Sequence, residues 1–255
     1  MKGIALQCYT IRDHCKTAKD FAVSARRVKK IGYDTVQISG LGPIPPAEIR
    51  SICEGEGLAI CATHESGKSI IETPEAVVEQ LAALGCKHTA YPYPHAPLKT
   101  LDDVKRLAGE LTRSGTVLRE AGMTLSYHNH QIELRKLDGK TILDWIYDLT
   151  APEVLKAEID TYWVQFGGGD PAGWLNKLKG RIPLLHLKDY AVNDDNQPVF
   201  AALGDGNLDF PSILSAARAG GCEWYIVEQD AGFTDAFVAI ETSLRFLESP
   251  AAGGG

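Results

Sequence analysis

Hydrophobic and polar positions follow one repeating unit along most of this chain. A short apolar run rich in β-branched residues is followed each time by a longer segment with helical periodicity. Eight apolar runs predict strands, at residues 3–9, 34–39, 58–64, 87–93, 123–130, 155–160, 182–189 and 224–230. The pattern therefore favours an α/β protein in which strands and helices alternate.

The segments between the strands carry helix signals. Residues 17–33 place Phe21, Ala25 and Val28 on one face, and Gly32 can end the helix in a left-handed conformation. Residues 73–85 begin with Thr-Pro, a favoured helix start, and end with glycine. Residues 101–122 and 211–221 show the same helical pattern and also end with glycine.

Alternating strands and helices imply a parallel sheet, which right-handed crossovers can close into a (β/α)₈ TIM barrel. The main alternative is a doubly wound open sheet, which usually shows a GxGxxG fingerprint after its first strand. The first predicted strand instead runs into QCYTIRD, and the later FGGGD has the wrong glycine spacing. We therefore predict one TIM-barrel domain over residues 1–250, followed by a flexible tail over 251–255.

Composition narrows the function classes. The net charge of −7 disfavours nucleic acid as a partner, because Lys and Arg dominate phosphate binding. The six cysteines show no CxxC spacing and lie in apolar segments, which is typical of buried reduced thiols. The start of the chain lacks the apolar region of a signal peptide, and no apolar run approaches the roughly 18 residues of a membrane span. We expect no membrane partner and a cytoplasmic location.

Polar residues gather at the C-terminal ends of the predicted strands, where TIM barrels carry their active sites. Glu133, Asp160, His186 and Glu228 come from four consecutive strand ends and would converge on a volume about the size of one ion. Three carboxylates and one imidazole favour Mn²⁺, Mg²⁺ or Co²⁺, and leave coordination positions open for substrate oxygens. Taken singly, Asp160 could cap the next helix, and His186 could be a core histidine.

At these residues the sequence resembles the sugar phosphate isomerase/epimerase superfamily, the xylose isomerase-like TIM barrels. The resemblance covers nearly the whole chain, from LQCYTIRD to IVEQDAG. The stretches that carry it are, in order, YHNHQIE, AEIDTYW, LLHLKDY, LGDGNLDF and YIVEQD.

The resemblance implies one divalent metal, most often Mn²⁺, held by Asp160, His186, Glu228 and a fourth ligand. Typical ketose epimerases place a glutamate at the position of His128, whereas the HNHxxE subgroup points to Glu133. We expect Glu133 to be the ligand, with His128 as the alternative.

Two departures from the family argue against an ordinary ketose 3-epimerase. A histidine expected three residues after the aspartate ligand is Trp163, and an arginine expected six residues after the histidine ligand is Val192. Lys188 and the additional His130 look instead like the subgroup that acts on keto-sugars and keto-glycosides. The resemblance therefore implies a sugar isomerase or epimerase that removes a proton next to a carbonyl, with a keto-glycoside lyase as the alternative.

Roles for individual residues follow from this chemistry. His130 is the first candidate for proton transfer, because the pKa of histidine lies near the working range. Glu133 or Glu228 could share that role, and Lys188 would supply positive charge to a substrate oxygen. His128 is a ligand, an orienting residue or a core histidine. The residues expected to bind the sugar are Tyr9, Arg12, His64, His128 and Trp163.

Two other functions are alternatives to a sugar isomerase or epimerase. An endonuclease IV-like repair enzyme would need about three metals and basic loops, which this composition does not favour. A non-catalytic subunit of a two-component enzyme is a further alternative, because residues 188–206 form a long segment that could meet a partner. A homo-oligomer, in which the same segment contacts another copy of this chain, is also possible.

Overall fold

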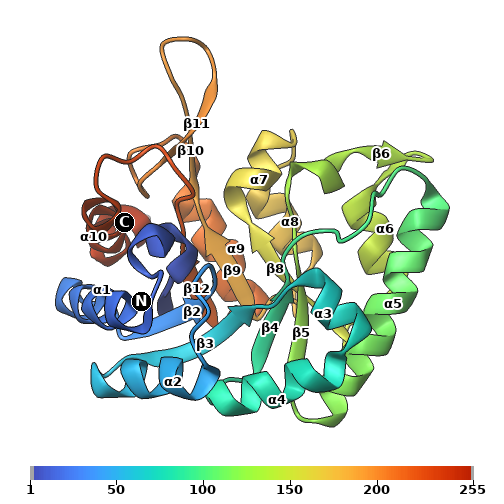
Figure 1. Ribbon diagram of the computed structural model, residues 1–255. Coiled ribbons are helices and arrows are strands. Elements are labelled where there is room, and N and C mark those ends of the chain that lie inside the picture. Colours follow the sequence, from blue (N-terminus) through green and yellow to red (C-terminus); the bar gives the residue numbers. More distant parts are fainter. Residues whose placement is uncertain (1–2, 254–255) are drawn as a thin grey trace.

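The computed structural model describes residues 3–253 and shows a closed barrel of parallel strands surrounded by helices (Figure 1). Around the barrel the strands follow the order β1-β12-β9-β8-β5-β4-β3-β2. Their bounds are β1 (Ile4–Gln7), β2 (Thr35–Ile38), β3 (Ala59–His64), β4 (His88–Tyr91), β5 (Thr124–His128), β8 (Leu155–Asp160), β9 (Leu184–Leu187) and β12 (Trp224–Val227). Closure of the sheet confirms the predicted TIM barrel and excludes the doubly wound alternative.

The helices form an outer ring in Figure 1, and most of the longer ones begin and end on the predicted signals. Thr17 and Thr100 each accept a backbone hydrogen bond from an aspartate three residues later, which completes a capping box. The helices are α1 (Ala18–Ile31), α2 (Pro46–Gly55), α3 (Gly67–Glu72), α4 (Pro74–Leu84), α5 (Leu101–Glu120), α6 (Ile142–Asp148), α7 (Thr161–Phe166), α8 (Pro171–Lys177), α9 (Phe210–Gly220), α10 (Ala236–Glu248) and α11 (Pro250–Gly253). Two 3₁₀ helices, η1 (Cys8–His14) and η2 (Gln131–Leu134), follow β1 and β5.

Two small antiparallel sheets stand apart from the barrel. One pairs β6 (Lys136–Leu137) with β7 (Lys140–Thr141), and the other pairs β10 (Asp189–Val192) with β11 (Pro198–Ala201). The β10–β11 hairpin projects beyond the barrel at the top of Figure 1. It contains most of the long segment that the sequence places after the seventh barrel strand.

Asp189 anchors the base of that hairpin. Its buried carboxylate accepts hydrogen bonds from the backbone N–H groups of Tyr190, Gly204, Gly206 and Leu208. A Cβ atom at position 206 would lie 2.3 Å from the Asp189 carboxylate, so only glycine fits there. The LGDG stretch is thus explained by packing around Asp189.

The inside of the barrel divides into an apolar floor and a polar layer above it. The floor is a cluster of Ala5, Cys61, Ala62, Leu184 and Ile226. Side chains two residues apart on a strand share a face. His64, His186 and Glu228 therefore point into the barrel two residues beyond Ala62, Leu184 and Ile226, where the floor ends.

All six cysteines are free thiols; five are buried and Cys222 is partly buried. The predicted flexible tail is wrong for residues 251–253, because α11 packs against α9 and α10 and buries Ala252. Residues 254 and 255 lie outside the described residues. Within residues 3–253, no helix has both the length and the apolar character that crossing a membrane requires.

Candidate active site

Four buried side chains from neighbouring strands bring potential metal-ligand atoms together at the C-terminal end of the barrel. These residues, here called the outer set, are His128, Asp160, His186 and Glu228, and their ligand atoms lie within 4.8 Å of one another. Strand register explains the grouping: His128 pairs with Glu158, Asp160 pairs with His186, and Glu228 directly follows β12 beside β9.

The outer set fits a divalent cation. Oδ1 of Asp160 caps helix α7 by accepting the Trp163 N–H, whereas the buried Oδ2 lies 3.0 Å from the Lys188 ammonium. The same oxygen lies 3.9 Å from Nε2 of His128 and 3.9 Å from Nδ1 of His186. Two imidazoles and two carboxylates form a donor set that suits Mn²⁺, Fe²⁺, Co²⁺ or Zn²⁺. Asp160 therefore caps a helix with one oxygen and turns the other toward Lys188 and the outer set.

Lys188 introduces a fixed positive charge beside this set. Its buried Nζ lies 2.7 Å from Glu228, 3.0 Å from Asp160 and 3.1 Å from Asp230. Burial alone would lower the pKa of Lys188, but these carboxylates raise it above the ordinary value. An ammonium has three N–H donors, and each of them has a carboxylate neighbour. Lys188 therefore neutralises the acidic cluster, which differs from the predicted contact with a substrate oxygen.

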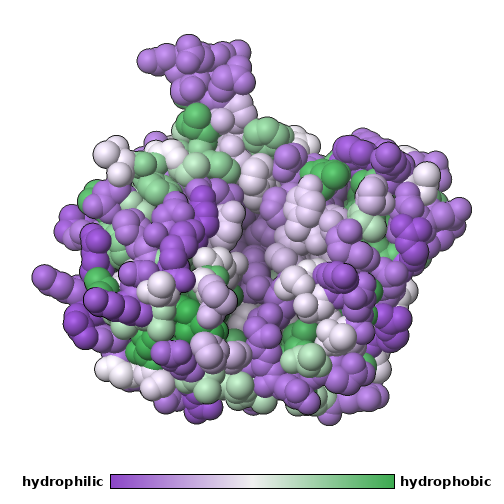
Figure 2. All heavy atoms as spheres, in the orientation of Figure 1, coloured by the Kyte–Doolittle hydropathy of each residue, from purple (hydrophilic) through white to green (hydrophobic). Residues whose placement is uncertain are grey.

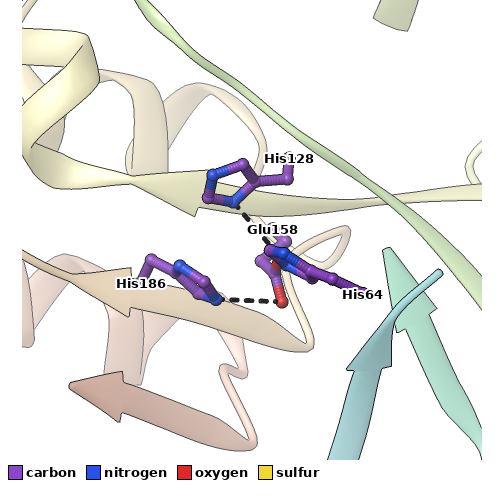
Figure 3. A group of neighbouring side chains, drawn as sticks. All are labelled: His64, His128, Glu158 and His186. Carbon is purple, nitrogen blue, oxygen red and sulfur yellow. Dashed lines mark hydrogen bonds and ion pairs between the residues drawn. The ribbon is translucent and has the colours of Figure 1, made fainter. Parts of the chain in front are cut away.

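A second group of side chains shares two histidines with the first. This inner set is His64, His128, Glu158 and His186 (Figure 3). The carboxylate of Glu158 lies between three imidazoles, with Oε2 2.5 Å from His64 Nε2 and 3.1 Å from His128 Nδ1. Its other oxygen accepts the Gln37 amide at 2.7 Å and lies 3.4 Å from His186 Nε2. Burial would raise the pKa of Glu158, but His186 and His64 hold it well below its usual range.

A cavity of about 510 Å³ opens directly above these sets. Figure 2 shows a hollow near the middle of the molecule, lined mostly by hydrophilic and neutral residues. Its walls include seven of the predicted site residues: Tyr9, Arg12, His64, His128, His130, Lys188 and Glu228. Asp160 and His186 are fully buried beneath it.

The prediction that Glu133 is a metal ligand is wrong, because Glu133 does not belong to the outer set. Its buried carboxylate accepts the Tyr127 hydroxyl at 2.9 Å and the His130 backbone N–H at 2.8 Å. The bond from His130 caps η2, and Glu133 belongs to neither group of potential metal ligands in the described residues. The alternative ligand, His128, occupies the place in the outer set.

His130 stands at the cavity wall between aromatic neighbours. Its ring centroid lies 5.1 Å from that of Tyr93 and 5.3 Å from that of Trp163. Burial, and then the Lys188 ammonium, lower its pKa to about 3, so the imidazole is neutral at neutral pH. Trp163 packs beside His130, and its contact with a sugar stays a prediction.

Arg12 and Tyr9 form another part of the cavity wall. The Arg12 guanidinium donates to the backbone carbonyls of Tyr9 at 2.8 Å and Asp230 at 3.0 Å, and lies over the Tyr9 ring. Arg12 therefore ties η1 to the loop after β12 while one face of Tyr9 stays exposed to the cavity.

Sequence reasoning missed Glu158 and Gln37 as parts of the site. Glu158 lies two residues before Asp160 on one strand, so strand alternation places both on the inner face. Gln37 is a polar residue within an otherwise apolar strand, and its side chain is fully buried. Both signals were present in AEID and TVQI.

Comparison with known proteins agrees with this architecture. Among curated relatives, the inosose dehydratase of Lacticaseibacillus casei is 28% identical over 170 residues, covering 60% of this chain and 56% of that protein. This chain thus matches about half the length of such relatives.

Solved structures share the fold over nearly the whole chain. A sugar phosphate isomerase/epimerase from Parabacteroides distasonis has a TM-score of 0.84 and 23% identity, covering 99% of this chain and 96% of that chain. A xylose isomerase-like TIM barrel protein from Mycobacterium smegmatis, in complex with magnesium, has a TM-score of 0.74 and 15% identity over 100% and 97% of the chains. At these identities the likeness shows the fold alone.

A family model described as "Xylose isomerase-like TIM barrel" matches residues 25–249. This match confirms the resemblance seen in the sequence and covers most of the barrel. The chain belongs to the xylose isomerase-like TIM barrel family.

Proposed function

We propose that this protein is an enzyme that removes a proton next to the carbonyl of a small polyhydroxylated ketone and expels water from the neighbouring carbon. One observation carries the proposal: a polar cavity places the neutral imidazole of His130 above the buried outer set and its Lys188 neighbour. Such a cavity suits a compact polar substrate such as a keto-sugar or a keto-cyclitol.

His128, Asp160, His186 and Glu228 would hold a divalent metal, for which we favour Mn²⁺, with Mg²⁺ and Co²⁺ as alternatives. The chemistry that such an ion supplies is Lewis-acid polarisation of a carbonyl oxygen, which makes the adjacent C–H group more acidic. The converging donor atoms of these four residues support this assignment, because buried charged groups are costly unless they are paired or coordinate a metal.

The residues of the chain itself would move the protons. A neutral His130 can accept the proton from the carbon next to the carbonyl. The electrons of that C–H bond then form a C=C bond as the C–O bond of the neighbouring hydroxyl breaks. His64 lines the same cavity from β3 and would supply the proton with which the hydroxyl leaves as water.

The named relatives favour elimination over epimerisation. Inosose dehydratases, which share 28% identity in the matched part, carry the loss of water in their name. Inosose is therefore the first substrate that we would test.

Epimerisation or isomerisation is the second candidate. His64 and His130 flank His128, with ring centroids 4.9 Å and 5.0 Å from it, and present two imidazoles to one cavity. Two such groups could remove a proton from one face of a carbon and return one to the other. The name of the Parabacteroides distasonis protein agrees with this candidate.

One experiment separates the candidates. The protein, loaded with Mn²⁺, is incubated in D₂O with inosose, ketoses and 3-keto-sugars, and the products are followed by NMR. We expect one C–H signal to disappear together with the formation of an unsaturated product. Deuterium incorporation without elimination would instead favour epimerisation, and no change in any of these compounds would reject both candidates.

A further inference from the structure

Each of the two histidines in the outer set has an acceptor beside its second ring nitrogen, the one that does not face the proposed metal. A histidine that binds a metal usually donates its other ring N–H to a nearby acceptor, which fixes the proton on that nitrogen. In this chain the acceptors come from the inner layer of the barrel, and both depend on Glu158.

Glu158 contacts His128 directly. Its Oε2 lies 3.1 Å from Nδ1 of His128, whereas Nε2 of the same ring points toward Asp160, with 3.9 Å between Nε2 and Oδ2. An ionised carboxylate only accepts hydrogen bonds. Although the Nδ1–Oε2 contact is not aligned as a hydrogen bond, the negative charge of Glu158 favours the proton of a neutral His128 on Nδ1, which leaves the Nε2 lone pair facing the outer set.

Glu158 reaches His186 through the Gln37 amide. Because the carboxylate accepts only, the NH₂ group of Gln37 must face it, at 2.7 Å. The Gln37 oxygen is then turned toward Nε2 of His186 at 2.6 Å and also accepts the Gln7 amide at 3.0 Å. A neutral His186 ring therefore donates from Nε2 and turns its bare Nδ1 toward Glu228 and Asp160.

We propose that Glu158 is a positioning residue that fixes the proton positions on His128 directly and on His186 through Gln37, so that one bare nitrogen of each faces the same metal. This inference rests on the metal assignment within the proposed function. It also accounts for a histidine at the end of β5, where the resembled epimerases have a glutamate. The carboxylate lies on the neighbouring strand β8, at the position that pairs with His128.

The test is the substitution Glu158→Gln. While Gln37 keeps donating to the side-chain oxygen, the new NH₂ group faces His128 and acts as a donor. It moves the His128 proton to Nε2, where the proton blocks the metal position. We expect the affinity for Co²⁺ and Mn²⁺, measured by chelator competition without substrate, to fall about 10- to 100-fold.

The matched control is Glu133→Gln, which makes the same exchange at another buried carboxylate outside the outer and inner sets. We expect its metal affinity to equal that of the wild type. If Glu158→Gln also binds both metals with wild-type affinity, or if the wild-type protein binds neither metal, the proposal is overturned.

A second measurement needs no substitution. Long-range ¹H–¹⁵N spectra of the histidine rings report which nitrogen carries the proton in the metal-free wild-type protein. We expect Nδ1–H at His128 in the wild type and Nε2–H in Glu158→Gln. A wild-type Nε2–H form would overturn the proposal even if the variant fails to fold. Inactivity toward every ketone would reject the proposed function, but it would not change these affinities or spectra.

Discussion

The ammonium of Lys188 lies 2.7 Å from Oε2 of Glu228, the same oxygen that lies 2.8 Å from Nδ1 of His186. One carboxylate oxygen thus serves both the fixed cation and the outer set. Because Asp160 is shared in the same way, Lys188 balances part of the buried negative charge that a metal would otherwise meet alone. Lys188 should therefore stabilise the metal-free protein and weaken its hold on a metal.

Lys188→Met tests this balance with a side chain of similar length and no charge. Removing one partner of a buried ion pair costs about 3–5 kcal/mol, because the remaining charges are left uncompensated. We expect the metal-free variant to lose stability of that order in urea unfolding, and added Mn²⁺ to restore much of it. Metal affinity should rise above that of the wild type.

The control for this variant is Lys140→Met, which removes an exposed pair with Asp148. An exposed pair contributes about 0–1 kcal/mol, so this control should unfold almost like the wild type. Equal stability of metal-free Lys188→Met and wild type would show that the ammonium does not balance the cluster.

Glu228→Gln removes a charged ligand from the outer set. The expected result is a metal affinity lower by more than about 100-fold, since loss of an outer partner alone costs about 10- to 100-fold. Metal content after dialysis and chelator competition measure the effect. Glu223→Gln makes the same exchange next to the opposite end of β12, where the side chain is exposed, and should keep wild-type affinity. A fully metallated Glu228→Gln protein would remove Glu228 from the ligand set.

His130→Ala separates proton transfer from metal binding. His130 lines the cavity but is not part of the outer set, so the variant should keep its metal content. Turnover of the substrate identified by NMR should fall about 10²- to 10⁴-fold, the usual contribution of general acid–base catalysis. His14→Ala, at an exposed histidine on η1, is the control and should keep full turnover. Undiminished turnover in His130→Ala would exclude His130 as the base.

The barrel could be predicted because each unit carries its own local signals. Capping residues, helix-ending glycines and apolar strand runs lie within short windows, and eight repeats leave few topologies. The same logic placed Asp160, His186 and Glu228 at strand ends, and the structure brings these three together.

Predictions from the sequence fail where the position of a side chain depends on the path of a turn, because no local sequence pattern predicts that path. Glu133 follows His130 by three residues, which is also the spacing of a capping box, and the η2 turn uses it in that way. Trp163 lies one helical turn past β8, where the rotation of α7 places it beside His130, and its contact with a sugar stays a prediction. Strand alternation could have predicted that Glu158 points into the barrel. Its role could not be predicted, because it depends on three histidines that come from other strands.

Glu133 also makes stability depend on pH. Burial raises its pKa from 4.5 to about 7, although hydrogen bonds from His130 and Tyr127 oppose the shift. Below pH 4.5 the carboxyl group is protonated in both the folded and the unfolded chain, and its favourable contribution is fully present. As the pH rises to 7 the unfolded chain ionises first, so the folded state loses about 3 kcal/mol from this group.

Glu133→Gln should remove this loss while keeping both hydrogen bonds, since the amide oxygen can accept the His130 N–H and the NH₂ group can donate to the Tyr127 hydroxyl. We therefore expect the variant to gain stability relative to the wild type between pH 5 and pH 8, by about 3 kcal/mol at most. Urea unfolding at both pH values measures the difference between the two proteins, which cancels the titration of all other groups. Parallel pH profiles would show that Glu133 ionises normally in the folded protein and that the buried carboxylate is solvated by more than its two partners.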